Sequence, residues 1–170
     1  MIFYTTMKVP VGKILLTGDE MGLIQISFIE FSRNNGIGEW IKNNNAKRDD
    51  NFFKEAVEEI NQYFQGQRQK FSVKMKMEGT LFQKQVWDAL SRIPFGETRS
   101  YGEIARKIGR PKAARAVGMA CRNNPLAVVI PCHRVVGSDG RLTGFAGGLP
   151  VKKKLLTLEK EVAGVGAPVV

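Results

Sequence analysis

The spacing of apolar residues changes part-way along the chain, and this change constrains the possible folds more than any other feature of the sequence. The first 30 residues contain short runs rich in β-branched and aromatic residues, separated by turns that contain glycine, which predicts an antiparallel meander. These runs are 3–9, 13–17 and 23–29. Residues 32–50 are polar and rich in Asn and Gly, so we expect a mobile loop there. Beyond it, apolar residues mostly recur every three or four positions, which predicts helices.

Two capping signals mark where helices begin in the second part of the chain. Thr80 precedes a stretch with helical periodicity and is expected to cap it. Ser100 and Glu103 have the spacing of a capping box, in which the hydroxyl and the carboxylate each bond a backbone N–H group at the helix start. The helices expected are 51–64, 80–92, 101–108, 113–123 and 151–160.

The composition of residues 67–79 indicates a linker, with one strand at 71–75, and we place a domain boundary there. We therefore expect an α+β protein of two domains. Residues 1–76 form a small sheet with a helix, and residues 77–170 form a mainly helical domain. In the second domain, the third and fourth expected helices are joined by a tight turn that contains Gly, which is the pattern of a helix-turn-helix.

Positive charge is concentrated in the second part of the chain. The 170 residues carry 26 Lys and Arg and 16 Asp and Glu, a formal net charge of +10. Residues 1–80 hold 11 basic and 10 acidic side chains, whereas residues 81–170 hold 15 basic and 6 acidic. Seven of those basic side chains lie between Arg99 and Arg122. Such a patch favours a polyanionic partner, nucleic acid rather than membrane, although a solvated surface would have the same composition.

Composition excludes several other classes of protein. A hydrophobic content of 43% argues against disorder, and no apolar run approaches the roughly 18–20 residues that span a bilayer. The first residues lack the basic leader and long apolar stretch of a secretory signal. The only cysteines, Cys121 and Cys132, and the only histidine, His133, are too few for a disulfide framework or a four-ligand zinc site. We expect a cytoplasmic protein without a metal.

The 113–123 helix has an unusual composition for one that reads bases. Small residues dominate it, and Arg115 is its main long side chain. Small side chains let a backbone approach its partner closely, as entry into the minor groove, about 6 Å wide, would require. Tight packing inside the domain would explain the same composition. Cys121 faces the same way as Val117 at helical spacing and is expected to be a core residue.

An apolar run at 126–130 leads to Cys132 and His133. By its composition the run is a buried strand. A thiol becomes a useful nucleophile when a base or a positive field stabilises its thiolate and lowers its free pKa of about 8.5. The pair therefore suggests nucleophilic chemistry, while a buried structural cysteine would explain the same dipeptide.

Longer motifs around this pair resemble those of a known family. The segment Pro131-Cys132-His133-Arg134-Val135, with Arg115-Ala116-Val117-Gly118 before it and Gly144-Phe145-Ala146-Gly147-Gly148-Leu149 after it, resembles the signature of the O6-alkylguanine-DNA alkyltransferases. The resemblance covers about residues 80–160. It implies direct-reversal DNA repair, in which an alkyl group moves irreversibly, once per molecule, from O6 of guanine in duplex DNA to Cys132. The resemblance also implies activity on O4-alkylated thymine and an RNase-H-like N-terminal domain that serves as scaffold. It further implies that the protein is a monomer and needs no cofactor.

The resemblance also assigns catalytic roles to individual residues. His133 would act as general base on Cys132, through a water molecule, because neighbouring residues of an extended chain point to opposite sides. Glu159, on the last expected helix, would orient His133 in the logic of a triad. Asn124 would brace the turn before the segment that carries Cys132.

The residues that the resemblance implies for DNA binding surround the helix-turn-helix. The target base lies inside a stack, so it must be flipped out. Arg115 would fill the gap that the base leaves, and the small-faced helix that carries it would enter the minor groove. Tyr101 would press on the target phosphate and line the pocket, and Ser138 would contact phosphate or sugar.

Two departures from the family limit what carries over. Phe145, Ala146 and Gly147 would line the substrate pocket, but some members have Tyr-Ser where this chain has Phe145-Ala146. Backbone N–H groups, rather than side-chain hydroxyls, must then donate hydrogen bonds to the region around O6 of the guanine. Some members bind zinc in the N-terminal domain, and the first 120 residues here contain neither Cys nor His.

Two other interpretations fit parts of the sequence. A DNA-binding module without catalysis, either a regulator or an alkyltransferase-like protein that only marks lesions, would explain the basic helix pair. The lesion-marking proteins lack the acceptor cysteine that is present here, and a regulator would carry longer base-reading side chains. A cysteine hydrolase using Cys132 and His133 would turn over repeatedly and would leave Arg115 and Tyr101 without a role. Alkyl transfer is the interpretation we favour.

Overall fold

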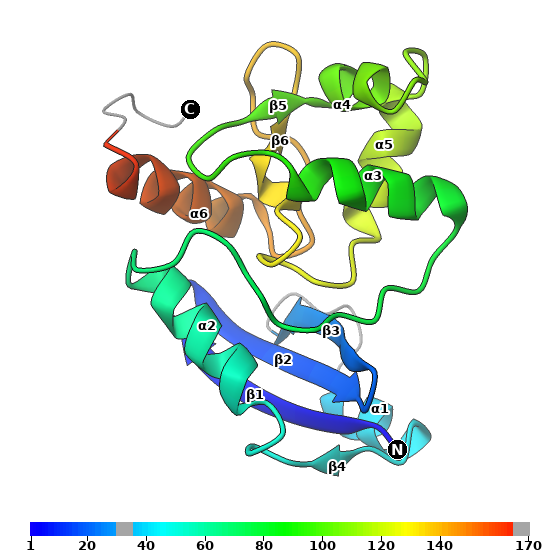
Figure 1. Ribbon diagram of the computed structural model, residues 1–170, viewed down its shortest axis with the longest axis vertical. Helices are drawn as coiled ribbons and strands as arrows, with labels where there is room; N and C mark the ends of the chain where they lie inside the picture. Colours follow the sequence, from blue (N-terminus) through cyan, green and yellow to red (C-terminus); the bar gives the residue numbers. More distant parts are fainter. Residues whose placement is uncertain (30–35, 165–170) are drawn as a thin grey trace. The chain divides into compact units, whose positions relative to one another are not determined.

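The computed structural model describes residues 1–29 and 36–164 of the chain, and it divides into two compact units at Met77. The first unit is built on one four-stranded sheet (Figure 1). β1 (Phe3–Val9), β2 (Gly12–Asp19) and β3 (Gly22–Phe28) pair antiparallel in chain order, so the predicted meander is confirmed. β4 (Lys47–Arg48) pairs with β1 in parallel, and the strand order is β3-β2-β1-β4.

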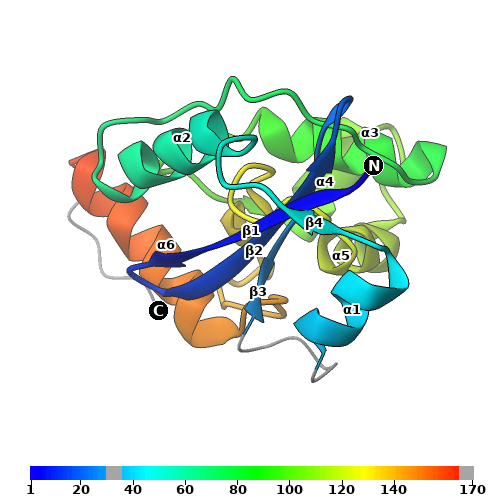
Figure 2. The ribbon, with the colours of Figure 1, turned by 90° about the horizontal axis from the view of Figure 1, so that it is seen from below.

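One helix, α2 (Lys54–Phe64), packs on this sheet through its contacts with β1 (Figure 2). The side chains that it buries are Ala56, Glu59, Ile60 and Tyr63. The buried carboxylate of Glu59 accepts the backbone N–H of Ser72 at 2.9 Å and also the hydroxyl of Ser72. Because a buried carboxylate must be hydrogen-bonded, these contacts hold the segment that leaves the unit.

Two predictions for this unit are wrong. The region predicted as a loop at 32–50 contains a helix, α1 (Ile37–Asn43), and β4, while its first residues, 32–35, lie outside the described part. The strand predicted at 71–75 is reduced to an isolated bridge between Leu23 and Met75. α1 buries none of its residues, and a helix without a buried face leaves no apolar period in the sequence.

The second unit is mainly helical, as predicted, and the α+β class of the whole chain is confirmed. α3 (Leu81–Ser91), α4 (Tyr101–Lys107) and α5 (Ala114–Arg122) pack on one another, and α6 (Leu149–Val162) is the last helix. In both views the part of the chain that directly follows α5, drawn in yellow, lies between α6 and α3 (Figures 1 and 2). Among the described residues, no helix has the length and apolar character needed to cross a membrane.

Short elements connect the helices to the segment that carries the nucleophile candidate. A 3-10 helix, η2 (Cys132–Arg134), continues directly into β6 (Val135–Val136). β6 pairs in parallel with β5 (Arg99–Ser100), which precedes α4. The start of α4 is therefore held beside the end of the Cys132 segment by backbone hydrogen bonds.

The buried strand predicted at 126–130 is not present, and that prediction is wrong. The segment turns on itself: Ile130 N–H bonds Leu126 O at 2.9 Å, and Val129 N–H bonds Ala127 O at 2.9 Å. Val128, between the last two, has a φ of 73°, which is a strained conformation for a β-branched residue. The run is apolar because it is buried, and burial alone does not distinguish a strand from a compact turn.

The predicted cap of α3 gives a stability test that is independent of function. Thr80 accepts the N–H of Gln83 at 3.1 Å, and the Gln83 side chain accepts the N–H of Thr80 at 3.0 Å. Thr80→Ala removes the first bond and should lower the free energy of unfolding by about 1 kcal/mol in urea melts. Thr80→Ser, which keeps the hydroxyl, should lose much less. Equal losses in the two variants would show that the hydroxyl does not cap α3.

Candidate active site

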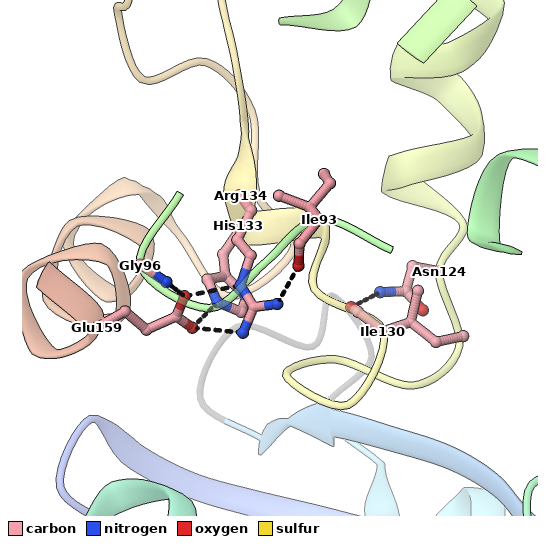
Figure 3. Close-up of polar contacts among 7 residues, drawn as sticks. All are labelled: Ile93, Gly96, Asn124, Ile130, His133, Arg134 and Glu159. Atoms are coloured by element: carbon pink, nitrogen blue, oxygen red, sulfur yellow. Dashed lines mark hydrogen bonds and ion pairs between the residues drawn. The ribbon is translucent and has the colours of Figure 1, made fainter. Parts of the chain in front are cut away.

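The carboxylate of Glu159 on α6 accepts hydrogen bonds from three places (Figure 3). His133 Nε2 lies 2.5 Å from Oε2, and Arg134 Nε lies 2.7 Å from Oε1. The backbone N–H of Gly96 reaches Oε1 at 3.3 Å. Glu159 and His133 are fully buried, and Arg134 is 5% exposed, so the group forms a closed network of buried charges.

This network determines which nitrogen of His133 is basic. Burial raises the pKa of the Glu159 carboxyl, but the hydrogen bonds from His133 and Arg134 and the charge of Arg134 outweigh burial and leave that pKa below its ordinary value. Burial also lowers the pKa of His133, against the opposing effect of Glu159, so the imidazole is neutral. An ionised Glu159 keeps the imidazole proton on Nε2, and Nδ1 is then the nitrogen that can accept a proton.

Arg134 holds Glu159 in place through a fork of contacts. Besides Nε, its Nη2 lies 3.2 Å from Glu159 Oε2, and its Nη1 donates to Ile93 O at 2.7 Å. The guanidinium lies over the ring of Phe95, 5.6 Å from the ring centroid. These contacts tie η2 both to α6 and to the loop that follows α3.

The candidate nucleophile, Cys132, is 8% exposed at the first position of η2. Burial raises the pKa of its thiol, while a hydrogen bond from Asn124 and the charge of Lys152 lower it in part. The resting thiol is therefore protonated, in contrast to the lowered pKa expected from the sequence. Since η2 is a tight 3-10 turn rather than an extended strand, the argument that Cys132 and His133 point to opposite sides does not apply.

Asn124 joins the two ends of the turn that precedes Cys132. Its side-chain amide donates to Ile130 O at 2.8 Å, and its side-chain oxygen accepts the N–H of Leu126 at 2.9 Å (Figure 3 shows the first). A further tight bond follows, from the N–H of Cys132 to Ile130 O at 2.8 Å. The amide side chain of Asn124 and the backbone bonds within the turn together fix the path of the chain between α5 and Cys132.

A cavity of about 490 Å³ opens beside Cys132, within the range of roughly 300–1,000 Å³ that is usual for small-molecule sites. Among the residues that the resemblance assigned to catalysis or DNA binding, those that line it are Tyr101, Arg115, Cys132, Ser138 and Phe145. Ala146 and Gly147 are not part of this lining. Cys121 is buried, as predicted, but it lines the cavity rather than only the core, and burial raises the pKa of its thiol to about 12.

Thr143, in the wall of the cavity, is held by two side chains. The hydroxyl of Tyr101 donates to Thr143 O at 3.1 Å. The ammonium of Lys152, which is fully buried, donates to Thr143 O at 2.8 Å and to Val135 O at 2.6 Å. The ammonium also lies 3.4 Å from Gly144 O, so the three hydrogen-bond partners given for it are all uncharged carbonyls.

Comparisons with known proteins agree with this geometry. The family model of the 6-O-methylguanine DNA methyltransferase DNA-binding domain matches residues 81–161, and that of the same family's ribonuclease-like domain matches residues 2–77. The chain belongs to the O6-methylguanine-DNA methyltransferase family. A methylated-DNA--protein-cysteine methyltransferase of Methanosarcina acetivorans is 48% identical over 159 residues, 93% of this chain and 98% of that protein. One from Mycobacterium tuberculosis is 45% identical over 163 residues, 96% of this chain and 95% of that protein.

Solved structures give the same assignment. The crystal structure of the M. tuberculosis O6-methylguanine methyltransferase matches with a TM-score of 0.86 and 42% identity, over 100% of this chain and 97% of that one. The structure of the M. tuberculosis protein in complex with DNA matches with a TM-score of 0.84 and 43% identity, over 98% of this chain and 95% of that one. The fold of this methyltransferase family therefore extends over both units.

Three residues of this methyltransferase-family site were missed from the sequence. Arg134 was part of the recognised motif but received no role, and Lys152 and Thr143 were not considered. A signal for Lys152 exists, because it lies on the same helical face as Leu155 and Leu156, which are buried. For Thr143 there is no such signal, since its contribution to the site is a backbone carbonyl.

The chain has one histidine, so a loss of stability near the pKa of an imidazole can be assigned to His133. Because the pKa of His133 is lowered in the folded chain, the unfolded chain takes up a proton near pH 6.5 that the folded chain does not. The contribution of His133 to the free energy of unfolding is therefore complete above about pH 6.5. Below that pH it falls by up to about 1.4 kcal/mol per pH unit. The Tm, measured by circular dichroism, should fall between about pH 7.5 and 5.5.

His133→Gln is the matched control for this experiment, because the chain then has no imidazole. The Tm of this variant should change little over the same interval. Glu159, whose pKa is also lowered, reduces stability only in stronger acid, below about pH 4.3. A His133→Gln protein whose Tm falls as steeply as that of the unchanged chain would assign the acid sensitivity to other groups.

Proposed function

We propose that this chain repairs DNA by moving an alkyl group from O6 of guanine in a duplex to its own Cys132 sulfur, once per molecule. The observation that carries the proposal is the thiol of Cys132 in a cavity, on a 3-10 turn whose next residue is a buried, neutral imidazole hydrogen-bonded to an ionised carboxylate. Membership of the methyltransferase family supports the same reaction. No cofactor is required, because the protein itself is the acceptor.

In the proposed reaction the S–C bond forms as the C–O6 bond breaks, in line. His133 receives the thiol proton at Nδ1 through a water molecule, and the imidazolium that results is stabilised by Glu159 at 2.5 Å. The electron pair of the broken bond leaves with guanine, which takes up the proton in the end. Because burial raises the pKa of Cys132, the thiol is protonated at rest and needs a base to take its proton for the attack. The thioether product is a poor leaving group, so turnover stops.

DNA would be bound by the second unit, and the first would serve as scaffold. Arg115 on α5 is exposed at the cavity, as a residue that fills the gap left by a flipped base must be. Tyr101 and Ser138 would contact the target nucleotide beside it. The Ala and Gly residues of α5 would let the helix enter the minor groove, where the backbone phosphates position the protein without specifying sequence. We also propose that the protein acts as a cytoplasmic monomer and accepts O4-alkylthymine.

The direct test of this proposal is a mass measurement. The full chain is incubated with a duplex containing O6-methylguanine, and the intact protein and its peptides are weighed. We expect each molecule to gain one methyl in place of hydrogen, mapped to Cys132, and we expect Cys132→Ser to gain none. An unmodified protein would favour a DNA-binding module without catalysis. Repeated turnover by one molecule would favour a hydrolase.

A second variant tests base flipping separately from chemistry. Arg115→Ala should slow methyl transfer from a duplex by about tenfold or more, because the opened stack loses the side chain that fills it. Reaction with the free alkylated base, which needs no flipping, should fall far less. Lys112→Ala is the control, since it removes a neighbouring positive charge that does not line the cavity. Equal losses of Arg115→Ala on both substrates would mean that Arg115 supports the cavity rather than the flipped state.

A further inference from the structure

α5 exposes three long side chains along one face. Arg115, Met119 and Arg122 follow one another at spacings of four and three residues, so they lie in a row on the helix surface, and all three are exposed. Met119 is 56% exposed, between two arginines, on a helix whose other residues are mostly small. Single exposed apolar side chains are common on proteins and need no explanation by themselves. The position of this one is the informative feature.

Met119 lines the same cavity as Cys132, together with both arginines of the row. The guanidinium of Arg122 lies beside Gly144, because a Cβ built at Gly144 would be 3.6 Å from its Nε, in ordinary van der Waals contact. A partner that meets this row therefore presents negative charge on both sides of an apolar surface. A DNA strand has this composition in its minor groove, where sugar carbons lie between successive phosphates.

We propose that Met119 packs against the deoxyribose of the target strand in the minor groove, as an apolar neighbour of Arg115 at the mouth of the cavity. The inference rests on the proposed function and adds to it a contact that is not electrostatic. An unbranched, flexible thioether side chain can follow an irregular surface such as a distorted sugar-phosphate strand. The contact would contribute to duplex affinity without releasing counterions, since it neutralises no phosphate.

The test compares variants in a Cys132→Ser background, so that binding to a duplex with O6-methylguanine is measured without reaction. Met119→Ala and Met119→Gln should weaken binding by roughly 5- to 20-fold, as expected for the loss of most of a buried Met contact, while Met119→Leu should stay within about twofold. The slope of log affinity against log salt should stay unchanged. Arg122→Ala, in contrast, removes an exposed arginine of the same row and should reduce that slope by about 0.9, the value for one lost phosphate contact.

Leu81→Ala is the matched control, because Leu81 is 74% exposed on α3 and does not line the cavity. Its affinity should equal that of the parent. With Cys132 present, the ratio of the duplex rate constant to the free-base rate constant should fall in Met119→Ala by the same factor as the affinity.

Three results would overturn the inference while leaving alkyl transfer intact. These are binding of Met119→Gln equal to that of the parent, a reduced salt slope in Met119→Ala, and equal losses with duplex and free base. The last would mean that Met119 supports the cavity and not the DNA contact. Failure of the unchanged chain to take up any alkyl group would instead overturn the proposed function, on which this inference rests.

Discussion

The buried carboxylate of Glu159 connects parts of the second unit that are far apart in the sequence. It accepts hydrogen bonds from His133 and Arg134 of η2 and from Gly96 in the loop after α3. A carboxylate can remain ionised inside a protein only when its oxygens are surrounded by donors, and removal of one partner leaves a buried charge without compensation. The orientation of α6 against η2 is therefore linked to the protonation state of His133. The same interaction that assembles the domain also keeps the imidazole in the tautomer that can accept a proton.

A second connection runs from α5 to Cys132, the candidate nucleophile. Asn124 closes the turn between them through Leu126 and Ile130, and Val128 within that turn has a positive φ. A β-branched residue remains in this conformation only when its surroundings require it, and such residues are concentrated at functional sites. The helix that lines the cavity and the thiol that lies within it are therefore positioned by one compact loop. A displacement of α5 would be transmitted to Cys132 over a short and well-defined stretch of backbone.

Local signals in the sequence predicted local structure well. The predicted cap at Thr80 and the predicted capping box at Ser100 are both present, because their hydrogen bonds involve residues only three positions apart. The three strands of the meander were predicted for the same reason, since glycine-containing turns and β-branched runs act over a few residues. The prediction was wrong for the apolar run at 126–130, where burial dictated the composition and a side-chain amide dictated the path of the backbone.

The residues of the candidate site likewise fall into those that the sequence indicated and those that only the structure revealed. The candidate nucleophile Cys132, the neighbouring His133 and the arginine on α5 were singled out from motifs of adjacent residues, which can be read directly from the sequence. The roles of Lys152 and Arg134 depend on carbonyls and a carboxylate that come from distant segments, and the place of Cys121 and Met119 depends on which face of α5 borders the cavity. Spacing along a helix groups side chains onto faces, but it does not say whether a face meets a core, a cavity or solvent. That outcome is decided only when α4, α5 and the 143–145 segment close around the same space, because a cavity is formed by surfaces that no single segment contains.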